Sequence, residues 1–199
     1  MYGILFYDGV EPIDIGAAFG VLSMAKRIAP DLQLAGIARK AGPVTCASGL
    51  QVIAEFGFED APAFDHLVVT GGPGWKAAAE DTATLAYLKT STAKLSAICT
   101  GAMILAAAGR LDGRRATTKV QVFDGEASPL TMLGEQVDAQ KAAIVDDGDV
   151  VTSGGVTLGI DGMFYCLARS HGEEVARETA RVMEYQRALA ANRAALGYV

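Results

Sequence analysis

Short apolar runs alternate along this chain with longer segments in which apolar residues recur at helical spacing. The runs end at glycine or polar residues, which is typical of buried β-strands followed by turns. We expect such strands at residues 4–6, 32–38, 65–72 and 94–99. We expect helices over residues 13–28, within 75–92 and over 101–109.

The second half of the chain adds a hairpin and a long helical region. Residues 142–155 read as two strands around Asp147-Gly148, a pair that favours a tight turn, and residues 157–195 are mostly helical in pattern. Two further strand regions are expected at 42–56, as a small edge pair, and at 114–118. Strands that alternate with helices predict an α/β fold: one domain, 1–199, with a mostly parallel sheet covered by helices on both faces.

Candidate functional residues follow the ends of several predicted strands. They are Asp14, Gly71-Gly72, Cys99 and Ser153-Gly154-Gly155. Ligands of open α/β sheets bind at the carboxyl ends of the strands. We therefore expect these four points to lie at one edge of the sheet and to form one crevice.

The segment AICTGAMILAAAG, residues 97–109, places Cys99 between a strand and a helix. A nucleophile elbow has this form, in which a tight turn lifts the nucleophile above the sheet and a nearby glycine allows close packing. The helix N-terminus would favour the thiolate and lower the pKa of Cys99. The alternative is a buried, inert cysteine, and this is the interpretation that we favour for Cys46 and Cys166.

Groups from neighbouring strand ends would complete a site around Cys99. The backbone N–H groups of Thr100 and Gly72 are candidates for an anion hole, although the glycines at 71–74 also fit a plain turn. We pair Asp14 with Cys99, because burial and a thiolate neighbour would raise the pKa of Asp14 and let it move a proton. Alternatively, Asp14 only complements the helix dipole.

Trp75 and Asp161 are weaker candidates for the pocket. Trp75 directly follows the glycine-rich turn and would form a wall of the pocket, but a place in the core or on the surface is the simpler interpretation. Asp161 lies in the helix predicted after Gly154-Gly155 and is a second carboxylate candidate.

The remaining composition argues against several other classes of protein. Of only two histidines, His66 opens a strand at the edge opposite Cys99 and His171 falls late in the C-terminal helical region, so a Cys–His hydrolytic pair is not expected. No cluster has metal-ligand spacing.

A formal net charge of -6 argues against nucleic acid as a partner, and no apolar run approaches the ~20 residues of a membrane span. Three cysteines without a regular framework and no signal-peptide pattern predict a cytoplasmic protein.

Four segments together resemble the ThiJ/PfpI superfamily, whose members share a flavodoxin-like sandwich of the class I glutamine amidotransferase type. They are YGILFYDGVEPIDIGAAFGVL, DHLVVTGGPG, SAICTGAMILAAAGRLDGRRATT and VVTSGGVTLGIDGMFYCLA. Within the superfamily the chain is most similar to the isocyanide hydratases, through PIDIGAA, CTGA, GRRATT and TSGGVTLGID; GRRATT adds Thr118 to the candidate pocket. The chain is also similar to the sensory half of some AraC-type regulators. These carry a C-terminal helix-turn-helix pair, for which we expect no room before Val199.

The resemblance to isocyanide hydratases implies a reaction and roles for individual residues. Cys99 would attack the carbon of R–N≡C, and water would convert the adduct to an N-substituted formamide. Asp14 would donate a proton and help to activate water, while the amides of Thr100 and Gly72 would hold the developing charge. No cofactor or metal is implied. The resemblance also implies a homodimer, with a small electrophile as the substrate.

The chain departs from the family pattern at Lys119, which follows RRATT where histidine is usual. That histidine belongs to the glyoxalase-like and protease-like branches, so its absence argues against their activities. We interpret Lys119 as a lysine that faces solvent. Two alternatives to a hydratase stay open: a non-catalytic sensor in which Cys99 is a redox- or ligand-responsive thiol, and a glyoxalase or deglycase acting on a 2-oxoaldehyde.

Overall fold

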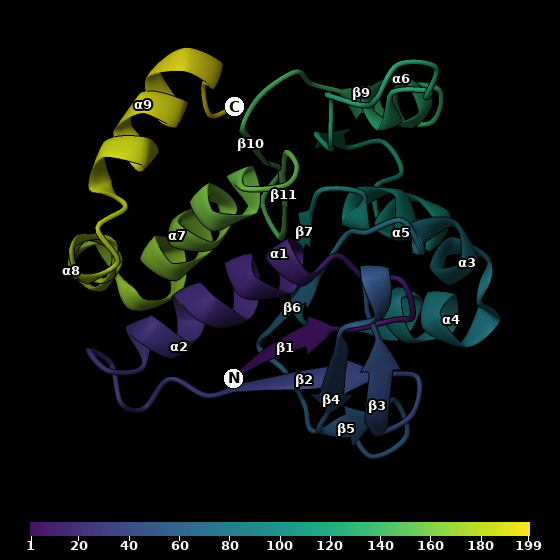
Figure 1. Ribbon diagram of the computed structural model, residues 1–199, viewed down its shortest axis with the longest axis horizontal. Helices are drawn as coiled ribbons and strands as arrows, with labels where there is room; N and C mark the ends of the chain where they lie inside the picture. The colour runs from purple at the N-terminus through teal and green to yellow at the C-terminus, as the bar shows by residue number, and fades with distance from the viewer.

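A computed structural model describes all 199 residues, and a seven-stranded sheet lies at its centre (Figure 1). The strands are β1 (Tyr2–Leu5), β2 (Leu34–Ala38), β5 (Phe56–Gly57), β6 (His66–Val69), β7 (Lys94–Ile98), β10 (Ile144–Asp146) and β11 (Val150–Ser153). Their order is β10-β11-β7-β6-β1-β2-β5. All neighbours pair in parallel except β10 and β11, which form the predicted hairpin.

Helices cover both faces of this sheet (Figure 1). One face carries α1 (Pro12–Ile15), the π-helical turn η1 (Gly16–Gly20), α2 (Val21–Ala25), α7 (Leu158–His171) and α8 (Glu173–Val182). The other carries α3 (Trp75–Glu80), α4 (Thr82–Thr90), α5 (Gly101–Ala107) and α6 (Pro129–Gly134). The last helix, α9 (Gln186–Leu196), packs outside α7 and α8. The expected flavodoxin-like three-layer sandwich is confirmed.

The two faces of the sheet explain why the strand sequences are continuously apolar. Successive side chains of a strand point to opposite faces, and here Ile4 packs in the core beneath α1, η1 and α2, while Leu5 packs in the core beneath α3 and α5. Val68 and Val69 of β6 divide between the two cores in the same way. Both faces are buried, so most strand positions are apolar, and the exceptions such as Ser96 and Thr152 are small polar residues.

The other elements agree with the predictions in type and differ in detail. The segment 42–56 forms β3 (Gly42–Thr45) and β4 (Gln51–Ala54), an antiparallel pair in a sheet of its own. The helix expected within 75–92 is two helices, because the Asp81 carboxylate accepts a hydrogen bond from Thr84 N at 2.9 Å and starts α4. The strand expected at 114–118 is β8 (Arg115–Ala116). It pairs with β9 (Asp138–Ala139), which was not predicted.

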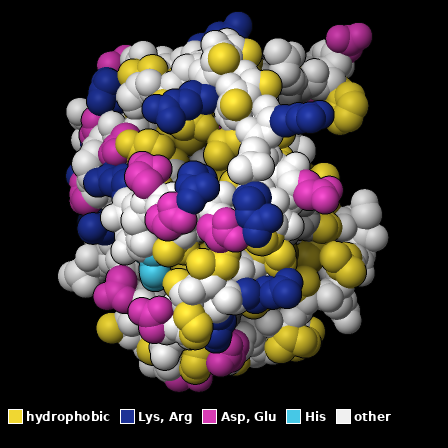
Figure 2. Space-filling view, turned by 90° about the vertical axis from the view of Figure 1, so that its left-hand side faces the viewer, with side chains coloured by type: hydrophobic (Ala, Val, Ile, Leu, Met, Phe, Trp, Pro, Cys, Tyr) yellow, Lys and Arg dark blue, Asp and Glu magenta, His cyan; other side chains and the backbone are white.

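The surface around α8 carries charges of both signs. Figure 2 shows acidic and basic side chains intermixed on the side of the molecule where α8 and α9 lie. On α8, Arg181 pairs with Glu178 at 2.7 Å, one helical turn away. Such mixing leaves no continuous basic stripe on this face. None of the helices combines the length and the apolar character that crossing a bilayer requires.

Candidate active site

Three strand ends meet around Cys99. The backbone N–H of Cys99 donates to the carbonyl of Ser153 at 3.2 Å, which joins the ends of β7 and β11. On the other side of β7, a Cβ atom placed on Gly71 would lie 2.8 Å from Asp14 Oδ2 and 2.8 Å from Cys99 Cβ. The structure therefore places the carboxyl of Asp14 beside Cys99, at the carboxyl edge of the sheet.

Cys99 sits on a sharp turn between β7 and α5. Its φ angle is 55°, in the left-handed region that costs a residue other than glycine roughly 1–3 kcal/mol. A Cβ atom on Gly101 would lie 2.1 Å from the carbonyl oxygen of Val69, so only glycine lets the helix start this close to β6. The predicted elbow geometry is confirmed.

Asp14 is fully buried in the first turn of α1. Its Oδ2 accepts a hydrogen bond from Gly71 N at 2.9 Å, whereas Oδ1 has no partner. Burial raises the pKa of Asp14 to about 7, although the Gly71 amide, the Cys99 thiol and the positive charge of Lys119 all lower it. This is the predicted direction. Near neutral pH the carboxyl is therefore present in both protonation states.

The pKa of Cys99 moves in the opposite direction from the prediction. Burial first, and then the negative charge of Asp14, raise it to about 12. The backbone N–H of Thr100 and the charge of Lys119 lower it, but they do not outweigh burial. The expectation of a lowered pKa is therefore wrong: a helix N-terminus contributes little when the sulfur has lost its water. The resting group is therefore a thiol that lies next to the carboxyl of Asp14.

The anion hole expected from Thr100 and Gly72 is only half available. The N–H of Gly72 already donates to Thr100 Oγ1 at 3.0 Å, so Gly72 orients the threonine. The N–H of Thr100 is the amide that acts on the sulfur. Thr118 is buried and donates from Oγ1 to the carbonyl oxygen of Cys99 at 2.6 Å. It therefore holds the backbone of the elbow.

Lys119 does not simply face solvent, and that interpretation was wrong. The side chain is half-buried. A Cβ atom placed on Gly155 would lie 2.6 Å from Cys99 Sγ and 3.0 Å from Lys119 Cβ. The lysine therefore stands beside the sulfur, in the position where the family pattern has histidine. The RRATT motif drew attention to position 119 in the sequence. Where the lysine side chain lies depends on how Thr117 and Thr118 pack against β11 and the turn at Cys99.

Tyr7 is a neighbour of the site that sequence reasoning did not single out. Its hydroxyl donates to the carbonyl of Thr70 at 3.1 Å. Burial, and then the negative charge of Asp14, raise its pKa well above the usual value, so it stays a neutral phenol. Tyr7 follows the first strand, as Asp14 does, and this position could have identified it from the sequence as a neighbour of the site.

Trp75 and Asp161 have other environments. Trp75 begins α3 and is half-buried against the core that this helix shares with α5. Asp161 is buried in the first turn of α7, where its carboxylate accepts hydrogen bonds from Tyr185 at 2.9 Å and Asn192 at 3.1 Å. The Asp161 carboxylate thus holds the C-terminal segment against α7.

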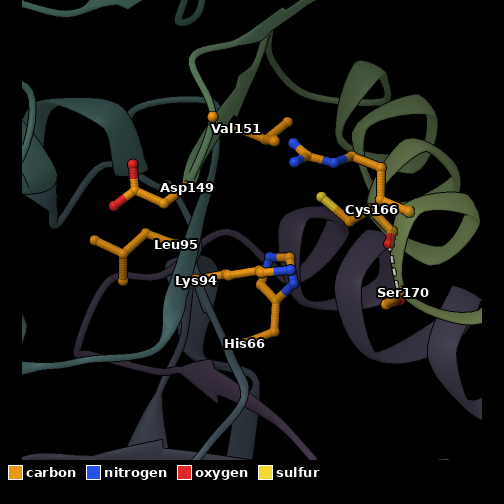
Figure 3. Close-up of a pocket in the computed structure, with 9 residues that line it drawn as sticks. His66, Lys94, Leu95, Asp149, Val151, Cys166 and Ser170 are labelled. Atoms are coloured by element: carbon orange, nitrogen blue, oxygen red, sulfur yellow. Dashed lines mark hydrogen bonds between the residues drawn. The ribbon is translucent and has the colours of Figure 1, made fainter.

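Both histidines lie away from Cys99, as predicted. His66 begins β6 and pairs in register with Lys94, at the end of β7 opposite Cys99. Figure 3 shows His66 close to Lys94 and Cys166, around a cavity of about 20 Å³. Burial and the charge of Lys94 lower the pKa of His66 to about 4, so the imidazole is neutral. His171 ends α7. Nowhere do three His, Cys, Asp or Glu side chains gather closely enough to hold a metal ion.

Comparisons with known proteins agree with this architecture. The model of the DJ-1/PfpI family matches residues 3–168. The chain is 34% identical over 187 residues to an isonitrile hydratase from Pseudomonas putida, covering 92% of this chain and 76% of that protein. It superposes on the crystal structure of a ThiJ/PfpI family protein from Pseudomonas syringae with a TM-score of 0.78, at 25% identity, covering 92% and 74%.

A transcriptional regulator is also among the relatives. The chain is 28% identical over 196 residues to the HTH-type regulator GbdR of Pseudomonas aeruginosa, covering 93% of this chain and 50% of the regulator. The relatives therefore include both an enzyme and a regulator, and they agree on the fold. Because the family model covers most of the sequence, the chain belongs to the DJ-1/PfpI family.

Proposed function

We propose that this protein is a cysteine-dependent hydratase that adds water to isocyanides and releases N-substituted formamides without a cofactor. The observation that carries the proposal is the pair of Asp14 and Cys99. A carboxyl group whose pKa is raised to about 7 lies beside a nucleophile on a strained turn, with no histidine nearby. The 34% identity to an isonitrile hydratase supports this choice of reaction.

The first step joins the sulfur of Cys99 to the terminal carbon of the isocyanide. The thiol proton passes to the carboxylate of Asp14 as the sulfur attacks, and the S–C bond forms. Asp14 then gives this proton to the same carbon, which yields a thioimidate, R–N=CH–S–Cys99. The amide of Thr100 and the charge of Lys119 stabilise the sulfur while it is negative.

The second step adds water to the thioimidate. The water oxygen bonds to the carbon, one proton reaches the nitrogen, and Asp14 serves as base and then as acid. The S–C bond then breaks, the hydroxyl proton returns to the sulfur through Asp14, and R–NH–CHO leaves. A carboxyl group with a pKa near the working pH suits both directions of transfer.

The experiment that tests the proposal is turnover of an alkyl and an aryl isocyanide, with the formamide identified by mass spectrometry. Cys99→Ala is expected to abolish turnover, and Asp14→Asn to reduce it by about 100-fold or more. Cys166→Ala is the matched control, because that cysteine is equally buried and lies at the other end of the sheet. Turnover by Cys99→Ala at the wild-type rate would refute the mechanism.

A sensor is the second candidate, and the similarity to a transcriptional regulator favours it. In that case no isocyanide would be consumed, and peroxide would convert Cys99 to a stable oxidised acid. The raised pKa of Cys99 does not separate the two candidates, because attack on an isocyanide and oxidation by peroxide both use the thiolate. The absence of a histidine from the site argues against a glyoxalase.

A further inference from the structure

The two sides of the site carry opposite charges. In the sheet, β11 and β6 are the neighbours of β7 on either side. Gly155 follows β11 and Gly71 follows β6, so these glycines flank Cys99 from opposite directions. Asp14 Oδ2 lies next to Gly71, whereas Lys119 Cβ lies next to Gly155. The carboxyl of Asp14 and the base of the Lys119 side chain are therefore on opposite sides of Cys99.

The backbone of Lys119 is fixed at both ends. On one side, the hydroxyl of Thr118 donates to the carbonyl of Cys99 at 2.6 Å. On the other, the carbonyl of Lys119 accepts from Leu130 N at 3.2 Å. The fold therefore sets where the Lys119 side chain begins, and its ammonium group is near enough for its charge to lower the pKa of both Cys99 and Asp14.

The charge of Lys119 has no partner in the protein. No carboxylate lies within ion-pair distance of its ammonium group, since none of the ion pairs of the chain includes it. The acidic groups whose charge bears on the site, Asp14 and Glu11, come from α1 and its N-cap on the β6 side. A half-buried cation without a counter-ion favours an anion beside it.

We propose that Lys119 binds a carboxylate of the substrate, so that the preferred substrates are isocyanides that carry a carboxylate close to the nitrogen. The inference rests on the proposed hydration for its reaction, but the anion subsite stands on its own geometry. With the isocyanide carbon at the sulfur and Asp14 on the β6 side, the R group extends toward β11. There it meets the ammonium group of Lys119, which makes Lys119 a residue that determines specificity.

The first experiment needs no turnover. Iodoacetate and iodoacetamide both alkylate a thiol with loss of iodide, and they differ in charge. Their rates at Cys99 are measured by mass spectrometry of the peptide, and the ratio of the rates reports the subsite. We expect Lys119→Gln to lower the ratio of iodoacetate to iodoacetamide by about tenfold, and Lys119→Arg to keep it.

A matched control removes the same charge elsewhere. Lys94→Gln changes an exposed lysine at the other end of β7 and should leave the ratio unchanged. If Lys119 only activates the sulfur, Lys119→Gln will slow both reagents equally, and the proposal is overturned. It is also overturned if the ratio does not change, or if iodoacetate fails to modify Cys99 in the wild-type protein.

The second experiment uses isocyanoacetate and its neutral methyl ester as substrates. Wild-type kcat/KM should favour the anion, and Lys119→Gln should lower kcat/KM for isocyanoacetate by about tenfold more than for the ester, which reverses or abolishes that preference. If the protein hydrates neither compound but the alkylation ratio depends on Lys119, the anion subsite stands and the proposed reaction fails. If the protein hydrates both compounds with equal kcat/KM, the proposed reaction is supported and the proposed anion subsite is refuted.

Discussion

Asp14→Asn should make this protein more stable at alkaline pH while it lowers the proposed hydratase activity. The wild-type carboxyl is fully buried, and its pKa is raised from 3.8 to about 7. Between these values the folded state keeps a proton that the unfolded chain has already lost. The unfolding free energy of the wild-type protein therefore falls as pH rises through this interval. Above pH 7 the full loss of unfolding free energy from ionising the buried carboxyl is present.

The magnitude follows from the size of this shift. About three pKa units, at 1.36 kcal/mol each, correspond to about 4 kcal/mol of unfolding free energy above pH 8. At pH 5 the unfolded carboxyl is mostly ionised, and the cost is already about 1.5 kcal/mol. Asparagine has the same shape, can still accept from Gly71 N, and carries no charge. The advantage of Asp14→Asn should thus grow by about 2.5 kcal/mol from pH 5 to pH 8.5.

The assay is urea unfolding at pH 5, 6, 7 and 8.5, followed through the fluorescence of Trp75, the single tryptophan. The quantity compared is the difference in unfolding free energy between Asp14→Asn and wild type at each pH. Any destabilisation by the amide group itself does not depend on pH, so it cancels when these differences are compared. Asp31→Asn, which removes an exposed carboxyl, is the control. The reasoning is refuted if the difference between Asp14→Asn and wild type is constant with pH, or shrinks as pH rises.

Three further substitutions test the turn at Cys99, the space beside its sulfur, and the anchoring of the C-terminal segment. Thr118→Val removes the donor at 2.6 Å from the Cys99 carbonyl and should cost about 1–3 kcal/mol in urea unfolding, with Thr118→Ser retaining most of the stability. Gly155→Ala would put a Cβ atom 2.6 Å from Cys99 Sγ and should slow alkylation of Cys99 by at least about tenfold. The control is Gly134→Ala, whose Cβ atom would meet its nearest neighbour at an ordinary 3.5 Å. Asp161→Ala leaves the donors from the C-terminal segment unpaired. It should speed proteolysis there but leave the alkylation rate of Cys99 unchanged; a slower rate would place Asp161 in the site after all.

The strands and the long helices could be predicted because their signal is local. A run such as Leu67 to Val69 is apolar at every position, since alternate residues enter two different cores, and no partner sequence is needed to recognise it. Elements of two or three residues are too short to show such a pattern. The strand β9 has two residues and was not predicted. It exists because its segment meets β8, and a short stretch of sequence does not contain that contact.

The homodimer and the cytoplasmic location stay predictions. Ile13 is 50% exposed and Phe19 is 37% exposed on the outer side of the first helical run. Sedimentation equilibrium of the wild-type protein measures the assembly directly, and a monomer at micromolar concentration would contradict the expected homodimer.

The sequence by itself determined the sheet, the elbow at Cys99 and the pairing with Asp14. Each of these follows from apolar periodicity, from a glycine two residues after a cysteine, or from a position after a strand. Tertiary structure decided the electrostatics: whether the sulfur rests as a thiol or a thiolate, whether the amide of Gly72 is free, and whether Lys119 lies beside Cys99. These depend on burial and on contacts between segments distant along the chain, and burial removes the water that sets the ordinary pKa of a thiol or a carboxyl.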